Sequence, residues 1–249
     1  MTSPTAGLLL IGDELLSGRT KDKNLGYIAD FLTALGIDLR EARVVPDLEE
    51  NIVAALNSLR ARYTYVFTTG GIGPTHDDIT ADAVAKAFGV AIDHDPRAVA
   101  ILKAHYQPAM LNEARLRMAR IPHGAELIEN PVSKAPGFRL ENVFVMAGVP
   151  KIMQAMLEAI APQLEHGEPI HSATVIAHMG EGDLAKPLKE IQDRHPNVVI
   201  GSYPFEETGG FGSNLVLRSR DRKALETAAR EVEEMTQALK AGGKVKVWS

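Results

Sequence analysis

The stretch from Tyr63 to Thr80 reads YTYVFTTGGIGPTHDDIT, and it decides the fold more than any other part of the sequence. Residues 63–68 are rich in aromatic and β-branched side chains, which predicts a strand. The glycines and proline of residues 70–74 predict a tight turn, and residues 77–88 predict a helix that Gly89 ends. A strand, a glycine-rich turn and a helix in this order are typical of α/β proteins with a parallel sheet.

The same alternation of strands and helices continues on both sides of this stretch. Leu8 to Ile11 is a short apolar run, as expected of a strand that is buried on both faces of a parallel sheet. The other predicted strands are residues 39–45 and 143–146, and the other predicted helices are residues 24–35, 49–60, 96–118 with a break near 107–108, and 150–164. This order predicts an α/β fold, a three-layer α/β/α sandwich with a mostly parallel sheet.

A polar segment with glycine and proline, residues 165–169, predicts a boundary between two domains. We therefore expect an α/β domain over residues 1–168 and a small α+β subdomain over residues 169–249. The predicted order in the second part is strand, helix, strand, strand, helix, over residues 173–177, 184–194, 198–202, 214–219 and 222–240. Asp183 would cap the first of these helices. We expect this subdomain to contribute little chemistry and to support a homo-oligomer, most simply a dimer.

The composition excludes several classes of function. The 249 residues include 24% charged and 45% hydrophobic residues, which is typical of a globular protein and excludes wholesale disorder. The absence of cysteine excludes disulfides, thiolate zinc sites, iron–sulfur clusters and cysteine nucleophiles. A net charge of -5 argues against non-specific binding to nucleic acid or to anionic membranes. No apolar run is long enough for a membrane helix, so we expect a cytoplasmic protein.

The glycine-rich turn is the strongest candidate for a ligand site. Gly70, Gly71 and Gly73 follow a strand and precede a helix, an arrangement in which backbone N–H groups and the helix N-terminus bind phosphate. The spacing matches neither a Walker A loop nor the dinucleotide-binding fingerprint. The same residues are compatible with a tight structural turn in which Thr75 is a helix N-cap. The sequence leaves both interpretations open.

Acidic residues follow three successive predicted strands. Glu14 belongs to the turn that begins at Gly12 after the first strand, Asp47 follows the second strand, and Asp77 and Asp78 follow the third. Their alternative roles are a solvated turn, a helix cap and partners of a helix dipole, respectively. Because the carboxyl ends of parallel strands meet at one edge, we expect these acids to converge there. Two adjacent acids beside a phosphate site also suit Mg²⁺.

Two further features concern basic residues and histidines. The loop over residues 130–138 contains two prolines and a glycine and carries Lys134, which either reaches a bound phosphate or is an ordinary surface charge. The eight histidines show no closely spaced pair at helical spacing and no dense cluster with acids. This pattern argues against a dedicated zinc site.

These motifs together resemble the molybdopterin-binding-like domain family, which includes MoaB and Mog, the N-terminal domain of CinA, and the N-terminal domain of eukaryotic FAD synthase. The matching residues are Gly12-Asp13-Glu14-Leu15-Leu16-Ser17-Gly18, Asn24, Val45-Pro46-Asp47, residues 70–80 and Gly148-Val149-Pro150. The glycine-rich stretch looks closest to the FAD synthase version. The order of elements to the end resembles CinA, the competence/damage-inducible protein, without its amidohydrolase domain. Ser133-Lys134 and Ala147 depart from the Gly-Thr and Pro of CinA-type chains.

The resemblance implies two kinds of chemistry. Nearer relatives hydrolyse a nucleotide diphosphate such as ADP-ribose or FAD with a divalent metal, and more distant relatives adenylylate molybdopterin. By the same resemblance, the residues that bind phosphate or nucleotide would be Gly12, Gly70, Gly71, Gly73, Thr75 and Lys134. Asp47 and Asp78 would be catalytic, and Asp78, Asp77 and Glu14 would hold the metal. That metal would be magnesium, with manganese or cobalt as alternatives and potassium as a further candidate cofactor.

Two hypotheses therefore remain open. The first is a metal-dependent pyrophosphatase that releases AMP from a substrate of the ADP-ribose or FAD type. The second is a protein of molybdenum cofactor metabolism that binds a pterin or a nucleotide, or transfers an adenylyl group. Carboxylates are required by the first hypothesis and optional in the second, so their presence does not decide between them. Both predict a small-molecule ligand and neither predicts a nucleic-acid or membrane partner.

Overall fold

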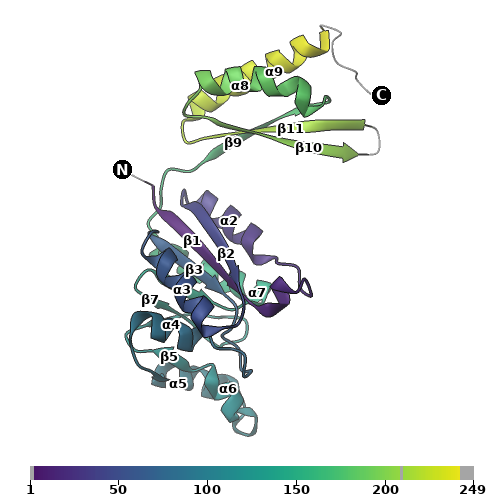
Figure 1. Ribbon diagram of the computed structural model, residues 1–249. Coiled ribbons are helices and arrows are strands. Elements are labelled where there is room, and N and C mark those ends of the chain that lie inside the picture. Colours follow the sequence, from purple (N-terminus) through teal and green to yellow (C-terminus); the bar gives the residue numbers. More distant parts are fainter. Residues whose placement is uncertain (1–2, 208–209, 242–249) are drawn as a thin grey trace. The chain divides into compact units, whose positions relative to one another are not determined.

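The computed structural model describes residues 3–207 and 210–241, and the chain divides into two compact units, Met1–Gly167 and Glu168–Ser249 (Figure 1). Each unit has its own sheet and its own apolar core. Within the described residues, no helix is long and apolar enough to cross a membrane.

The main sheet of the N-terminal unit has six strands within the described residues 3–167, in the order β2-β1-β3-β8-β7-β6. Their bounds are β1 (Thr5–Ile11), β2 (Asp38–Val45), β3 (Tyr65–Thr69), β6 (Glu126–Ile128), β7 (Gly137–Leu140) and β8 (Val143–Met146). The first four strands in this order run parallel, whereas β7 and β6 are antiparallel to their neighbours. Ile11 pairs with Val45, and Thr69 pairs with both Leu10 and Met146. The four parallel strands therefore end at the same edge.

Apolar side chains cover both faces of this sheet. Leu9 and Val66 belong to a core on one face, with α3, α4 and α5, whereas Leu8 and Phe67 belong to a core on the other face, with α2 and α7. The helices are α2 (Asn24–Ala34), α3 (Glu49–Arg60), α4 (Thr80–Phe88), α5 (Pro96–His105) and α7 (Pro150–Ile160), which a short 3-10 turn, η2 (Ala161–Gln163), extends. Because neighbouring residues of one strand point to opposite faces, both must be apolar in a sheet that helices cover twice. The predicted three-layer sandwich is confirmed.

The segment after β3 differs from its prediction. The helix α4 begins at Thr80, not near Asp77, and its N-cap is Ile79. Asp77 and Asp78 therefore lie in the turn before the helix, so the prediction that they belong to its first turn is wrong. Asp78 instead accepts hydrogen bonds from Thr75 and closes the turn locally. Such a side-chain-to-backbone bond competes with helix formation.

A small lobe between α4 and β6 holds the predicted break in the 96–118 region. It consists of β4 (Ile92–His94), α5, the 3-10 turn η1 (Pro108–Met110), α6 (Glu113–Arg117) and β5 (Arg120–Pro122). The strands β4 and β5 pair antiparallel, and the pairing was not predicted because three-residue strands carry almost no periodicity. Asn112 caps α6 by accepting a hydrogen bond from the Arg115 N–H.

The C-terminal unit has the predicted order of strand, helix, strand, strand and helix. Its elements are β9 (His171–Ala177), α8 (Glu181–Arg194), β10 (Val199–Glu207), β11 (Gly210–Ser219) and α9 (Arg222–Ala241). The sheet is antiparallel with the order β10-β11-β9. Gly180, not Asp183, is the N-cap of α8, so the predicted cap is wrong; Asp183 lies inside the first turn.

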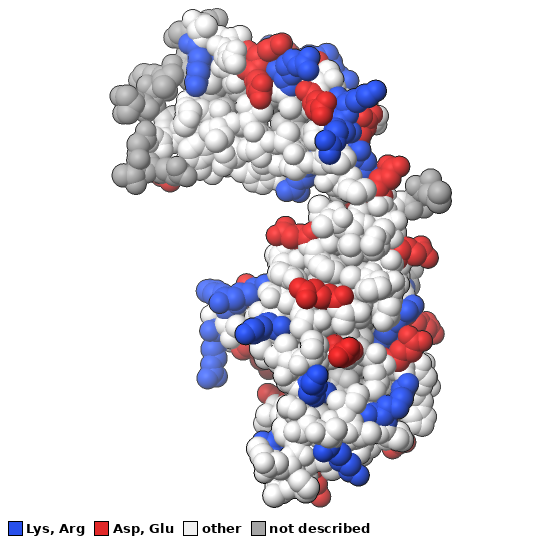
Figure 2. All heavy atoms as spheres, turned by 180° about the vertical axis from the view of Figure 1, so that it is seen from behind, with Lys and Arg blue, Asp and Glu red and all other residues white. Residues whose placement is uncertain are grey.

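The two helices of the C-terminal unit cover one face of its sheet. Leu184 and Leu188 of α8 and Val232 of α9 pack on Leu215 and Leu217 of β11. The buried residues of α9 lie three or four positions apart and form one packed stripe: Leu225, Ala228, Val232 and Thr236. Figure 2 shows charged side chains gathered over the helices of this unit, whereas its sheet side is largely uncharged.

Candidate functional site

A cavity of about 640 Å³ opens at the edge where the parallel strands of the N-terminal unit end. Its walls come from the loops that follow β1, β2, β3 and β8, and from residues near α5 and α6. The volume is in the range of pockets for small molecules and cofactors. Of the site residues that the sequence predicted, those lining it are Gly12, Glu14, Asp47, Gly70, Gly71, Gly73, Asp77 and Asp78. Thr75 and Lys134 are not among the lining residues.

The glycines of the turn are required by its packing. Gly70 has φ +106° and Gly71 has φ +67°, which disfavour residues with a side chain. A Cβ atom on Gly70 would lie 2.1 Å from the carbonyl oxygen of Ile11, and one on Gly71 would lie 2.1 Å from Oγ1 of Thr80. Thr80 Oγ1 donates to the Gly70 carbonyl oxygen at 3.0 Å, and its N–H donates to the Gly71 carbonyl oxygen at 2.9 Å. The turn is thus both a structural element and a wall of the cavity.

Asp78 holds the second half of the same turn. One of its carboxylate oxygens, Oδ2, accepts the Thr75 N–H at 2.8 Å and also the Thr75 hydroxyl. The prediction that Thr75 is a helix N-cap is therefore wrong, because its hydroxyl is engaged inside the turn. A Cβ on Gly73 would lie 2.7 Å from Asp78 Oδ2, so Gly73 allows this carboxylate to lie against the backbone.

Asp47 links the turn after β2 to a short helix after β1, α1 (Asp13–Leu16), which carries Glu14 where the sequence predicted a turn. Its Oδ2 accepts the N–H of Asp13 at 2.9 Å. Burial raises the pKa of Asp47, and the negative charges of Asp13, Glu14 and Asp77 raise that pKa further, against the lowering effect of the Asp13 bond. Asp47 does not cap α3, whose N-cap is Leu48 with no side-chain hydrogen bond, so this alternative is wrong. The acids that follow three strands are therefore close enough to repel one another.

Two buried asparagines organise the remaining loops of this edge. Asn24 is 5% exposed, and its Nδ2 donates to the Gly148 carbonyl oxygen at 2.8 Å. A Cβ on Gly148 would lie 3.2 Å from the Cα of Gly70, so the loop after β8 packs directly on the glycine-rich turn. Asn130 is 3% exposed and holds the loop before β7 by hydrogen bonds to four backbone or side-chain groups of Val132, Ser133 and Ala135.

The loop that carries Lys134 meets the cavity through its neighbours. Ser133 and Ala135 line the cavity, whereas Lys134 has φ +62° and does not. A lysine in the left-handed region is unusual, and the Asn130 bonds around it hold this conformation. Sequence reasoning did not identify Asn130 as the organiser of this loop, although asparagine before a turn is a recognisable signal.

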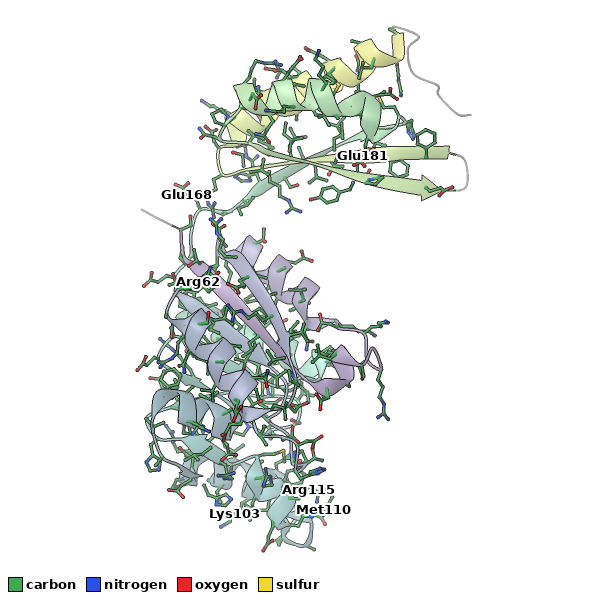
Figure 3. The ribbon with its side chains drawn as sticks, in the orientation of Figure 1. Arg62, Lys103, Met110, Arg115, Glu168 and Glu181 are labelled. Atoms are coloured by element: carbon green, nitrogen blue, oxygen red, sulfur yellow. The ribbon has the colours of Figure 1, made fainter. Side chains whose placement is uncertain are left out.

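A wall that sequence reasoning missed comes from the lobe with α5 and α6. Tyr106, Arg115 and Met118 line the cavity there. Arg117, on the same helix as Arg115, donates to the carbonyl oxygen of Asp78 at 3.4 Å and so ties α6 to the glycine-rich turn. Figure 3 shows Arg115 and Met110 side by side on this lobe. No local motif marks these residues, because they come from a separate segment of the chain.

The acidic side chains of the cavity are the candidate ligands of a metal ion. Within residues 3–207 and 210–241, no three histidine, aspartate or glutamate side chains converge so as to enclose a metal by themselves. The carboxylates of Glu14, Asp47, Asp77 and Asp78 nevertheless line the cavity, and their oxygens are hard donors. Mg²⁺ is typically held by one or two carboxylates together with substrate phosphates. The donor set therefore fits a divalent cation that binds with a phosphate ligand.

Comparisons with known proteins agree with this architecture. Residues 7–166 match the family described as the probable molybdopterin binding domain, and residues 169–242 match the middle domain of FAD synthase. A protein of Aeropyrum pernix is 35% identical over 93% of this chain and 95% of its own length, and one of Thermoplasma acidophilum is 33% identical over 97% and 98%.

A solved structure supports the same assignment for the N-terminal unit. The crystal structure of CinA from Thermoplasma acidophilum, described as a protein of unknown function, is 37% identical and has a TM-score of 0.62. The match covers 65% of this chain and 98% of that one. The chain belongs to the molybdopterin-binding-like family, with a C-terminal part that matches the FAD synthase middle domain.

Proposed function

We propose that this protein hydrolyses the pyrophosphate bond of a nucleotide diphosphate, of the ADP-ribose or FAD type, with the help of a divalent cation. The observation that carries the proposal is the meeting of four carboxylates and a glycine-rich turn in one cavity, where the charges of Glu14 and Asp77 act on Asp47. Repulsion between carboxylates costs free energy, which a bound cation offsets. The match to the FAD synthase middle domain and the resemblance to pyrophosphatases in the family support the choice of substrate.

The residues divide into three roles. Gly70, Gly71 and Gly73 let a phosphate approach the backbone closely, as the Cβ-free surface of the turn permits. Asp77, Asp78 and Glu14 would hold the cation, which supplies positive charge against the phosphates. Because Oδ2 of Asp78 accepts both Thr75 bonds, its Oδ1 is the oxygen that would contact the cation.

Asp47 is the proposed general base. Burial raises the pKa of this carboxyl group, and a carboxylate with a raised pKa is a stronger base. Asp47 would take a proton from a water molecule whose oxygen attacks one phosphorus. The P–O–P bond then breaks, and the products are AMP and a second phosphate monoester. One oxygen of Asp47 stays fixed by the Asp13 N–H during this step.

The alternative is a protein that binds a pterin or nucleotide, or transfers an adenylyl group, without hydrolysing a pyrophosphate bond. The description of the matching family as a probable molybdopterin binding domain favours it. The absence of a three-residue metal cluster within the described part of the chain is also compatible with it. A protein that binds without turnover would show ligand affinity and no product.

One assay separates the two functions. The full chain is incubated with ADP-ribose, FAD, NAD or CoA, each with Mg²⁺, Mn²⁺ or Co²⁺ and with or without K⁺, and AMP release is measured. AMP from at least one metal-dependent combination is expected. No AMP from any combination, together with measurable ligand binding, would establish the binding function instead.

A point variant tests the proposed site directly. Asp78→Asn is expected to lower turnover by about 100-fold or more, because the charge that faces the cation is lost. Its amide oxygen can still accept the Thr75 bonds, so the melting temperature should stay close to that of the unchanged protein. The matched control is Asp30→Asn on the exposed side of α2, which should leave turnover unchanged. Equal turnover of both variants contradicts the metal role.

A further inference from the structure

The wall of the cavity formed by α5, α6 and their connection differs chemically from the wall formed by the strand ends. The strand-end wall is glycine-rich and acidic, whereas the other wall presents an aromatic ring, a guanidinium and a thioether, from Tyr106, Arg115 and Met118. A cavity of about 640 Å³ exceeds what two phosphates and a cation fill, so the second wall faces another part of the ligand. Figure 1 shows α6 beyond the edge of the sheet.

Tyr106 and Arg115 form a defined stack on this wall. The Cζ atom of Arg115 lies 4.9 Å from the centre of the Tyr106 ring, within the distance of a cation–π contact. Arg115 also donates through Nη1 to the carbonyl oxygen of Met110, and the His105 ring meets the Tyr106 ring edge-on at 4.8 Å. Both side chains are partly buried. The stack is thus held from several sides while it still lines the cavity.

Arg115 is the one basic residue among the described residues that line this cavity. A guanidinium binds phosphate through its N–H edge, or stacks on a ring through its planar face. One N–H group of Arg115 is already used by Met110, and the Cζ atom of Arg115 lies over the Tyr106 ring. Tyr106 and Arg115 both line the cavity, so the pair is within reach of a flat group of the ligand.

We propose that the Tyr106–Arg115 stack recognises the planar heteroaromatic ring of the ligand, while the glycine-rich turn binds its phosphates. The inference rests on the proposed function only in that the ligand is a nucleotide. It makes Tyr106 and Arg115 the residues that distinguish a nucleotide from a sugar phosphate of the same charge. Stacking of a base on aromatic or guanidinium groups contributes affinity that does not depend on charge alone.

The test measures binding, not turnover, by isothermal titration of the full chain with AMP and with ribose 5-phosphate. The two probes share a phosphate and a sugar, and only AMP has a base. The unchanged protein is expected to bind AMP more tightly. Tyr106→Leu and Arg115→Met should each weaken AMP binding by about tenfold or more and leave ribose 5-phosphate binding within about twofold.

Arg115→Lys tests whether Arg115 contacts the ring of the ligand or its phosphate. Lysine keeps the positive charge and loses the plane, so this variant should behave as Arg115→Met does. Lys103→Met is the matched control, because Lys103 lies exposed on α5 of the same lobe, outside the lining of the cavity (Figure 3). It should change neither affinity. Tyr106 also packs against the core, so thermal melting must show that Tyr106→Leu is folded.

Three results would overturn the proposal. They are equal affinity of the unchanged protein for the two probes, equal losses for both probes in the variants, and recovery of AMP binding by Arg115→Lys. A protein that prefers AMP through this stack but releases no AMP from any substrate supports the inference and contradicts the hydrolase. If the protein releases AMP from a substrate but the variants lose affinity for both probes equally, the proposed function is supported and this inference is contradicted.

Discussion

The two units of this protein place their loops differently. In the N-terminal unit, four parallel strands end at one edge, and the turns that follow them bring Gly12, Asp47, Gly70 and Gly148 around one cavity. In the C-terminal unit, β11 is antiparallel to both of its neighbours in the sheet, so neighbouring strands end at opposite edges. Residues that lie far apart in sequence therefore converge in the first unit and not in the second. Strand direction alone explains where the candidate chemistry gathers.

The two sheets also differ in the number of faces that helices cover. Helices cover both faces of the N-terminal sheet, and β3 is buried along its whole length. Helices cover one face of the C-terminal sheet, and β9 alternates between buried residues such as Val175 and exposed ones such as Ile176, which is 57% exposed. A strand's burial pattern thus records how many layers pack on its sheet.

The largest effect is expected where the glycine-rich turn meets α4. Gly71→Ala places a Cβ 2.1 Å from Thr80 Oγ1 at a positive φ, so it should lower the free energy of unfolding by about 3 kcal/mol and abolish ligand binding. Gly89→Ala is the matched control, since Gly89 has φ +66° and no atom within 4 Å of the added Cβ. It should cost about 1 kcal/mol. Urea unfolding measures the free energy of unfolding of both variants. Equal losses would show that the positive φ, and not the contact with Thr80, is the cause.

Removal of the C-terminal unit tests whether the site belongs to the N-terminal unit alone. A chain that ends at Glu168 keeps every residue that lines the cavity, so metal-dependent ligand binding should persist. We also expect light scattering to show a loss of mass larger than the deleted residues explain, because we predict that this unit supports a homo-oligomer. Loss of binding in a chain that is still folded would assign part of the site to the C-terminal unit. An unchanged state of assembly would contradict the predicted oligomer contact.

Much of the fold follows from local patterns. The helix over residues 49–60 and the strand over residues 143–146 have the predicted bounds, because a clear apolar period and an isolated apolar run are strong signals. The convergence of Asp47 with the acids after β1 and β3 was predictable too, since it depends only on parallel strands. The outer ends of β10 and β11 were not predicted, because glycine and proline weaken the strand pattern in residues 199–214.

The details of the candidate site depend on contacts that sequence patterns do not contain. The start of α4 is set by the bonds between Thr75 and Asp78, and a sequence with acids before an apolar period equally suits an earlier start. The stack of Tyr106 and Arg115 depends on how the small lobe folds back to the sheet edge. Neither residue belongs to a motif, so only the three-dimensional structure connects them with the glycine-rich turn.

A moderate effect is expected at Asp47, whose pKa is raised above the ordinary value of 3.8. Above the raised pKa, the carboxylate is ionised in the folded state at a cost that the unfolded state does not have. Asp47→Asn should therefore raise the melting temperature of the ligand-free protein at neutral pH and keep the Asp13 bond through its amide oxygen. The gain should fade as the pH falls through the raised pKa. Asp30→Asn serves as the control, and a gain that is the same at every pH would contradict the charge repulsion.

The smallest effect is expected at Glu231, the C-terminal unit's counterpart of Asp47. Hydrogen bonds from Arg194 at 2.7 Å and with His195 at 3.0 Å lower its pKa, so its charge stabilises the fold where the charge of Asp47 destabilises it. This stabilisation is complete above the unfolded-state pKa of 4.5 and is lost as the pH falls through the lowered value. Glu231→Gln should lower the free energy of unfolding at neutral pH by less than about 1 kcal/mol, because the pair is partly exposed.

Hydrogen exchange of α8 and α9 measures the difference, with Glu234→Gln on α9 as control, and the difference should vanish in acid. A loss that persists below the lowered pKa would assign the role of Glu231 to packing and would remove the contrast between the two acids.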